Sequence, residues 1–209
     1  MKKWINLAGI ARAACALGIV LALAVPFQAQ AAEDDETFTP ELLAKAEAGD
    51  VDAMCDVAFY YYFGEGVAAN RDEAARWYRK AADLGDAYAQ YNLATLYSVG
   101  QGVPKDFEQA AYWYGKAAEQ GNVNAQYNLG VCYRDGTGIY KDCSEAAKWF
   151  LKAAQEDDAD AQYDLGRLYA EGKGVDQSNE EAAKWYGKAA AQGHEKAKTA
   201  LSQLGVRGE

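Results

Sequence analysis

The side chains best suited to covalent or metal chemistry in this 209-residue chain are four cysteines and a single histidine. A nucleophilic site needs a base beside its Ser or Cys, and a structural zinc site needs about four Cys or His ligands. His194 is the only histidine, and Cys55 and Cys132 lie in distant parts of the sequence. The carboxylates suggest no acid/base pair, and no Gly-x-x-x-x-Gly-Lys-Ser/Thr string is present. We therefore expect no catalytic residue, no metal site and no cofactor.

Cys132 and Cys143 are candidates for a disulfide. The sequence places Cys132 near the end of one helix and Cys143 near the start of the next, and antiparallel packing brings such ends together. In an oxidising compartment a bond there would add about 2–3 kcal/mol of stability. In the alternative, Cys132 is a small core residue, because Leu96 and Leu168 hold the same place, and Cys143 is a surface thiol. Cys55 has no obvious mate.

The N-terminus has the pattern of an export signal. Lys2, Lys3 and Arg12 precede or flank an apolar run over 13–25, and Ala29-Gln30-Ala31 follows it. We predict cleavage after Ala31, so that residues 1–31 are a signal peptide and the mature chain is periplasmic or secreted. The apolar run is shorter than the roughly 20 residues that span a bilayer, although an uncleaved anchor stays an alternative.

The charge balance favours some partners over others. The formal net charge is −10, and removal of the three basic residues of the signal leaves −13. Such a surface repels nucleic acid and anionic lipid, so we expect no nucleic-acid partner and no membrane contact after cleavage. The charge weakly favours basic proteins or peptides, unless it serves only solubility.

A repeat of 36 residues runs through the mature chain. Three residue types recur at this interval without a gap: Trp77, Trp113, Trp149 and Trp185; Gly66, Gly102, Gly138 and Gly174; Lys80, Lys116, Lys152 and Lys188. Such a period is typical of solenoids, in which each unit stacks on the next.

Each unit is predicted to form two helices. In the second unit, apolar residues at helical spacing predict a first helix over 89–97, which ends at Gly100 and Gly102. An acceptor side chain followed three residues later by Glu or Gln predicts the start of a second helix, as at Asp106 and Gln109. The tryptophans should lie in the core.

Half-units are predicted at both ends, because 40–49 matches the end of a second helix and 197–204 the start of a first helix. We therefore predict an all-α fold: an α-solenoid, or superhelix, of four 36-residue helix-turn-helix repeats with half-repeat caps. It should cover residues 40–204, between a short acidic linker (32–39) and a C-terminal tail (205–209).

The repeated string resembles the Sel-1-like repeat family, a relative of the tetratricopeptide repeats. The third unit carries the motif most fully, in Ala125, Leu129, Gly130, Tyr133, Gly136, Gly138, Ile139, Ala146, Ala147, Trp149, Phe150, Lys152, Ala153 and Ala154. The resemblance implies a non-catalytic adaptor or scaffold that binds a protein or peptide. In the related tetratricopeptide arrays, the first helices line a concave groove. The corresponding residues are Asp56, Asn92, Asn128, Asp164, Tyr91, Tyr127, Tyr163, Thr95, Arg134 and Arg167.

Two alternatives stay open. The tyrosines and asparagines of this set could instead make hydrogen bonds between helices within the solenoid. Some cysteine-rich relatives carry penicillin-binding or β-lactamase labels, which makes a secreted enzyme the alternative function. The regular cysteine spacing of those relatives and the Ser-x-x-Lys motif are both missing here.

Overall fold

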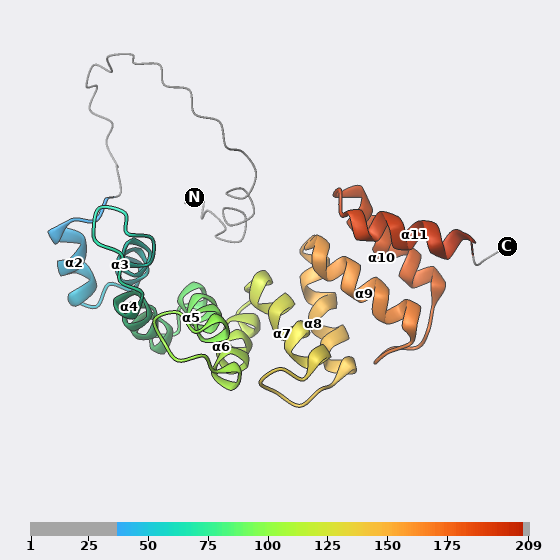
Figure 1. The fold of residues 1–209 in the computed structure, drawn as a ribbon, viewed down its shortest axis with the longest axis horizontal. Helices are drawn as coiled ribbons and strands as arrows, with labels where there is room; N and C mark the ends of the chain where they lie inside the picture. Colours follow the sequence, from blue (N-terminus) through green and yellow to red (C-terminus); the bar gives the residue numbers. More distant parts are fainter. Residues whose placement is uncertain (1–36, 207–209) are drawn as a thin grey trace, which may run out of the picture. The chain divides into compact units, whose positions relative to one another are not determined.

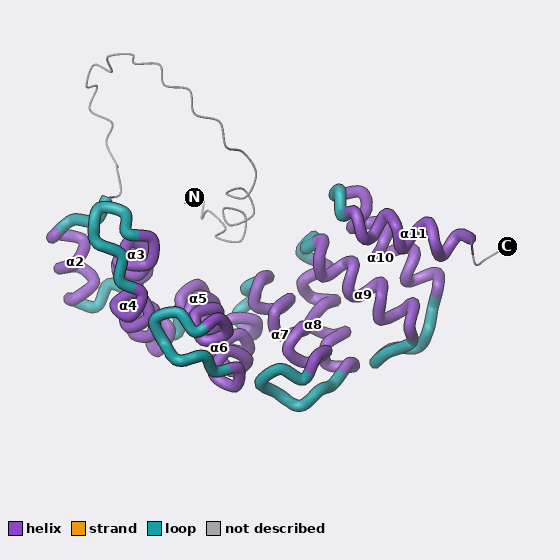
Figure 2. Tube along the Cα trace, in the orientation of Figure 1, coloured by secondary structure: helices purple, strands orange, loops and turns teal. Residues whose placement is uncertain are grey.

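The computed structural model describes residues 37–206, which belong to one compact unit. The predicted signal peptide, residues 32–36 of the predicted acidic linker and residues 207–209 lie outside the described residues. Within the described range all regular secondary structure is helical, and the helices follow one another along the unit in sequence order (Figures 1 and 2). No helix in this range is both long and apolar enough to cross a membrane.

The helices alternate between two kinds, which we name A and B. The A helices are α3 (Val51–Phe63), α5 (Ala87–Val99), α7 (Val123–Asp135) and α9 (Ala159–Glu171). The B helices are α4 (Arg71–Asp83), α6 (Phe107–Glu119), α8 (Cys143–Gln155) and α10 (Asn179–Ala191). The predicted half-units correspond to α2 (Pro40–Glu47) and α11 (Glu195–Val206).

Stacking between neighbours builds the unit. Each helix packs mainly against the helices before and after it in sequence, from α2 to α11. Every A and B helix has 13 residues, and each kind begins at intervals of 36. The predicted α-solenoid of four helix-turn-helix repeats with half-repeat ends is confirmed.

Polar side chains start the helices. The B-helix caps predicted from the sequence accept backbone N–H bonds as expected, for example Asn70 Oδ1 from Glu73 N at 3.1 Å. The A helices also begin with caps, which the sequence analysis missed: Asp50, Asp86, Asn122 and Asp158 each accept from the backbone N–H three residues on. Each such cap stabilises its helix by about 1 kcal/mol.

The second glycine of each A–B turn locks one repeat onto the previous one. A Cβ at Gly102 would lie 2.0 Å from the carbonyl oxygen of Arg71, the first residue of α4. At Gly138 it would lie 1.9 Å from the carbonyl oxygen of Phe107, which begins α6. These turns therefore rest directly on the start of the preceding B helix, at a separation that no larger residue permits.

Small residues let the A and B helices approach within a repeat. The alanines of the B helices α4, α6 and α8 are buried, and Phe150 of α8 is fully buried. A Cβ at Gly130 of α7 would lie 2.7 Å from the Phe150 ring, so the Leu-Gly pair of the motif makes room for that ring. Trp77, Trp113 and Trp185 are buried as predicted, whereas Trp149 is partly exposed.

A buried glutamine joins each of the A helices α5, α7 and α9 to neighbouring helix ends. Gln90 donates to the carbonyl of Ala82 at 3.1 Å, and its own Oε1 accepts from Gln120 Nε2 at 2.8 Å. Gln120 also donates to the carbonyl of Gly85 at 2.9 Å. In the fourth repeat, Gln162 and Gln192 make the same bonds as Gln90 and Gln120 do in the second.

The third repeat lacks this bond. Glu156 stands where Gln120 and Gln192 stand, and a carboxylate cannot donate. Gln126 Oε1 is accordingly buried without a hydrogen-bond partner in the described structure. An acceptor left in this state costs about 1–3 kcal/mol of stability.

The cysteines form no disulfide in the described residues, because Cys55, Cys132 and Cys143 are all free. The predicted Cys132–Cys143 bond is not formed in this structure and stays a prediction for the oxidised protein. Cys132 is buried in the core, at the place that Leu96 and Leu168 occupy in other repeats, whereas Cys143 begins α8 and is partly exposed. Burial raises the pKa of Cys132 to about 11. The pKa of Cys55 is also well above its ordinary value, through burial and the nearby carboxylate of Asp86.

We predict that Glu156→Gln stabilises the protein by about 1 kcal/mol, because the new amide can donate to Gln126 Oε1. Urea denaturation followed by circular dichroism measures the change. The reverse substitution at the matching place, Gln120→Glu, should lower the stability by about 1–2 kcal/mol. Equal stability of Glu156→Gln and the wild type would contradict this account of the orphaned oxygen.

We predict that iodoacetamide modifies Cys143 before Cys55 or Cys132 in the native protein, because only thiolates react and the two buried thiols stay protonated. Peptide mass spectrometry after timed labelling measures the order, and labelling in urea should make all three equivalent. Recovery of a Cys132–Cys143 linked peptide from unreduced protein would instead restore the predicted bond.

Candidate functional site

The A helices carry every residue of the predicted groove. Asn92 and Asp164 are only 7% and 5% exposed, so they present little surface to a partner. The other predicted positions are partly buried. The predicted groove residues therefore mainly contact neighbouring A helices. Their few exposed atoms lie on the A-helix side of the unit.

Tyrosines bridge one repeat to the next. The hydroxyl of Tyr127 in α7 donates to Asp164 Oδ2 in α9 at 3.3 Å. Burial raises the pKa of the equivalent Tyr91 in α5, and Asn128 in α7 is close enough for its amide to lower that pKa in part. The two predicted series, Tyr and Asn/Asp, thus meet each other across repeat junctions, as the alternative interpretation of these residues expected.

Asp164 holds two arginines. Its Oδ2 lies 2.8 Å from Nη1 of Arg134, and its Oδ1 lies 3.0 Å from Nη2 of Arg167. Arg134 also donates through Nε and Nη2 to Asp135, at 2.7 and 2.6 Å, which holds the pKa of the Asp135 carboxyl below its ordinary value. Burial and the Asp164 carboxylate raise the pKa of Tyr127, so its hydroxyl stays protonated and can donate. This cluster, the Asp164 cluster, ties α7 to α9.

Asn92 and Thr95 bond mainly within their own helix. Asn92 Nδ2 donates to the carbonyl of Tyr88 at 2.9 Å, and Thr95 Oγ1 donates to the carbonyl of Tyr91 at 3.0 Å. Thr95 Oγ1 also lies 3.3 Å from the hydroxyl of Tyr114 in α6. Asp56, at the equivalent place in α3, is partly buried.

The exposed end of the A-helix face lies at a position that the sequence analysis did not select. The last residue of each A helix forms a row, which we name the A-end row: Phe63, Val99, Asp135 and Glu171. Phe63 and Val99 are 40% and 52% exposed, and the side chains of Asp135 and Glu171 are 46% and 40% exposed. The sequence could have indicated this row, because each of its residues lies four positions after the A-helix position that Thr95 and Arg167 occupy, which is one helical turn.

The single histidine supports the last helix. His194 Nδ1 accepts from the backbone N–H of Ala197 in α11, and its Nε2 lies 3.2 Å from Asp160 Oδ1. Its ring stacks on Tyr163 with centroids 4.7 Å apart. Tyr163, a predicted groove residue, is thus engaged with the start of the terminal half-repeat. Among the described residues no cluster of three or more His, Cys, Asp or Glu could hold a metal ion.

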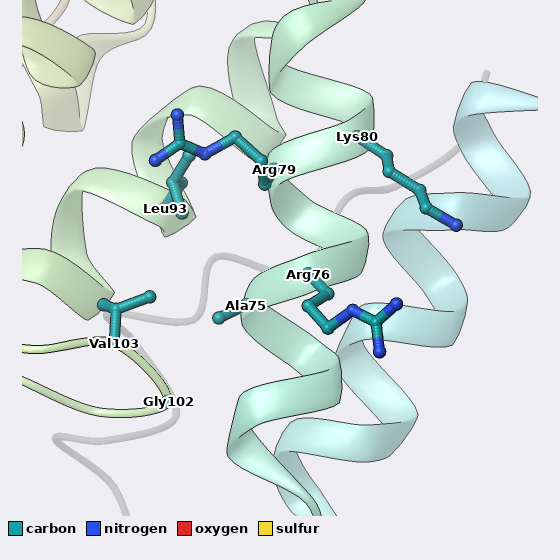
Figure 3. A pocket seen from close by; sticks show the side chains of 7 residues that line it. All are labelled: Ala75, Arg76, Arg79, Lys80, Leu93, Gly102 and Val103. Atoms are coloured by element: carbon teal, nitrogen blue, oxygen red, sulfur yellow. The ribbon is translucent and has the colours of Figure 1, made fainter.

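A cavity of about 320 Å³ lies between α4 and the second repeat. It is lined by Ala75, Arg76, Arg79, Lys80, Leu93, Gly102 and Val103. Figure 3 shows Arg79 reaching across Leu93, whereas Arg76 and Lys80 point the other way. The three cations therefore do not converge on one point.

The Sel1 repeat matches the chain four times, at residues 51–86, 87–122, 123–158 and 159–194. A comparison with curated proteins gave no match. Among solved structures, a protective antigen of uropathogenic Escherichia coli with an SLR fold is 39% identical, with a TM-score of 0.77 over 80% of this chain and 36% of that one. A Sel1 repeat protein from Oxalobacter formigenes is 33% identical, with a TM-score of 0.68 over 78% of this chain and 65% of that one.

The cysteine rich protein B of Helicobacter pylori is 27% identical, with a TM-score of 0.50 over 64% of this chain and 96% of that one. The chain thus spans about a third of the Escherichia coli protein and about two thirds of the Oxalobacter protein. Each of the four matched segments starts at an A helix and ends after a B helix. The matches cover residues 51–194 without a gap, and the chain belongs to the Sel1 repeat family.

Proposed function

We propose that this protein is an exported, non-catalytic scaffold that binds a segment of another protein along its A-helix face. Proteins built from Sel1 repeats generally serve as scaffolds for protein interactions. The observation that carries the proposal here is the A-end row, in which apolar side chains at the first two repeats are followed by acidic ones at the last two.

The A-end row is apolar in the first two repeats and acidic in the last two, so it offers both apolar contact area and negative charge to a partner. The Phe63 ring packs on the partly buried Phe59 with centroids 4.7 Å apart, and Phe63 and Val99 are both exposed apolar side chains. Asp135 and Glu171 are still exposed although they contact Arg134 and Lys173. A segment with an apolar residue at one end and basic residues at the other complements this order, and charge complementarity sets its orientation.

The buried residues of the predicted groove have a supporting part in this proposal. The Tyr127–Asp164 bond and the Arg134–Asp164–Arg167 pairs fix adjacent A helices relative to each other. They thereby hold the A-end row in place before a partner arrives, which reduces the entropic cost of binding.

Export is proposed from the N-terminal pattern of the sequence, with the mature protein in the periplasm or outside the cell. The related Escherichia coli protein is a protective antigen, which is in keeping with export. The strongly acidic composition of the mature chain favours a basic partner over nucleic acid or anionic lipid.

We predict that selection from a random peptide library on the purified protein enriches peptides with an aromatic or aliphatic residue followed by Lys or Arg. Phe63→Ala should weaken binding of such a peptide about tenfold, because the ring forms the centre of the apolar end. Fluorescence anisotropy measures the dissociation constants.

Phe107→Ala is the matched control for that experiment. Phe107 is 42% exposed, slightly more than Phe63, but it begins the B helix α6. Its loss should leave peptide binding unchanged. A selection without basic peptides, or an equal effect of both substitutions, would contradict binding along the A-helix face.

We predict that the protein isolated from its native cells begins at Ala32, because signal peptidase cleaves after small residues such as those at Ala29 and Ala31. Intact-mass measurement of the periplasmic and culture fractions checks this. Full-length chain in the membrane fraction would support the uncleaved anchor instead.

A further inference from the structure

One position in the B helices faces the aromatic residues of the following repeat. The residues at this position are 36 apart, and they are Leu43 in α2, Arg79 in α4, Gly115 in α6 and Leu151 in α8. Across the junction from each stand a tyrosine of the next A helix and a tryptophan of the next B helix, at fixed offsets in the sequence. The same junction therefore occurs four times, and of its three residues only the one opposite the tyrosine and the tryptophan varies.

At the second junction a cation covers the rings. The guanidinium of Arg79 lies 5.5 Å from the ring centroid of Tyr97 and 5.1 Å from that of Trp113. It also donates through Nη2 to the Tyr97 hydroxyl. Trp113 is only 6% exposed under this cover.

At the first and last junctions a leucine takes this place. Leu151 packs in the same apolar cluster as Tyr169 and Trp185, and Leu43 packs against the cluster that contains Trp77. Trp77 and Trp185 are each 6% exposed, as Trp113 is. An aliphatic side chain therefore fits this junction, and it buries the tryptophan.

The third junction has no side chain at this position. A Cβ built at Gly115 meets no atom within 4 Å, and Trp149 across the junction is partly exposed, unlike the other three tryptophans of the repeats. We name the open space at Gly115, beside Tyr133 and Trp149, the Gly115 gap. It is a site in which the chain itself lacks the side chain that completes the junction elsewhere.

Charged residues of both signs lie near the gap. The carboxylates of Glu145 and Asp142 act on Tyr133, and two lysines lie on the helices α6 and α8 that border the gap. Lys152 Nζ lies 3.7 Å from the Trp149 ring centroid, and Lys116 follows Gly115 in α6. Neither lysine forms a salt bridge within the described part of the chain, whereas Lys148 is paired with Glu145 at 2.5 Å. Glu119 lies one turn further along α6. Asp142 caps α8 and Glu145 pairs with Lys148. Lys116, which lies 5.7 Å from the Tyr112 ring centroid, and Lys152 are therefore the charged groups near the gap that are left for a partner's carboxylate.

We propose that the Gly115 gap is a second docking site, which receives a leucine or similar aliphatic side chain from a partner protein, with an acidic residue beside it. The partner's side chain takes the place that Leu151 and Leu43 fill within this chain. Because those two residues lie on helices, a helix is the form of partner segment that matches the site. The carboxylate beside it meets Lys116 or Lys152.

This site is independent of the proposed function, because none of its residues belongs to the A-end row and the partner segment there is acidic. Binding along the A-end row and binding at the Gly115 gap can each fail without the other. A peptide that binds at one of the two surfaces should not compete with a peptide at the other.

The test uses a synthetic helical peptide with one leucine and a glutamate one turn before and one turn after it. Alanine fills its other positions on that face. Titration into the purified protein, followed by the indole N–H resonance of Trp149, should show saturable binding with a dissociation constant of about 1 mM or tighter. The same peptide with alanine in place of leucine should bind at least about tenfold more weakly, the factor that burial of one leucine provides.

Gly115→Leu should fill the gap from within and weaken binding of the leucine peptide by a similar factor. Gly187→Leu is the matched control, because Gly187 holds the same place in α10 and an added Cβ there is also free of contacts. Gly115→Ala raises helix propensity without filling the gap, so it should keep binding. Circular dichroism confirms that each variant is folded, and Gly115→Met replaces Gly115→Leu if that variant unfolds.

Three results would overturn the proposal. The first is unchanged binding of the leucine peptide by the variant that fills the gap. The second is equal binding of the leucine and alanine peptides by the wild type, or no saturable binding at all. The third is concentration-dependent self-association of the wild type that Gly115→Leu abolishes, which would assign the gap to a second copy of this chain.

Discussion

Close contact between successive repeats is the constraint on which the rest of this structure depends. A single A–B hairpin cannot bury its apolar faces alone, so each repeat is stable only against its neighbours. The contact of Gly102 with the carbonyl of Arg71 fixes this stacking at one point, because no Cβ fits between the two backbones. The same contact recurs at Gly138 and Phe107, which keeps the rotation between repeats regular.

Because the stacking is regular, a residue that differs from its equivalents in the other repeats changes a contact that those repeats make. Glu156 leaves the buried oxygen of Gln126 without a donor, although glutamines supply one in the neighbouring repeats. In the first repeat Met54 and Leu84 stand where Gln90 and Gln120 stand, so no buried amide there needs the hydrogen bond. Gly115 leaves Trp149 partly uncovered. A departure that removes a contact without replacing it lowers stability or leaves surface for a partner.

The two sides of the stack differ in how they use polar residues. On the A-helix side, most polar residues of the predicted groove bond to other residues of the unit, as in the Asp164 cluster. The exposed A-end row is left to meet a partner, with its apolar and acidic halves held at fixed places. On the B-helix side, lysines cover the tryptophan faces, as Lys80 and Lys152 do at 3.7 Å from the rings of Trp77 and Trp149.

The sequence by itself determined the fold, because the 36-residue period of Trp, Gly and Lys is a direct record of repeat stacking. It also determined the B-helix starts, such as Asn70, since a cap bonds to residues only three positions away. It could not show whether Asn92, Asn128 and Asp164 face solvent or a neighbouring helix. Helical spacing gives the side of the helix on which a residue lies, but not what lies opposite that side. Only the tertiary structure showed that Tyr127 bonds to Asp164 one repeat away, and that Cys132 turns into the core and away from a bond with Cys143. Contacts between repeats depend on the rotation of one hairpin against the next, and that rotation is set by packing of the whole junction.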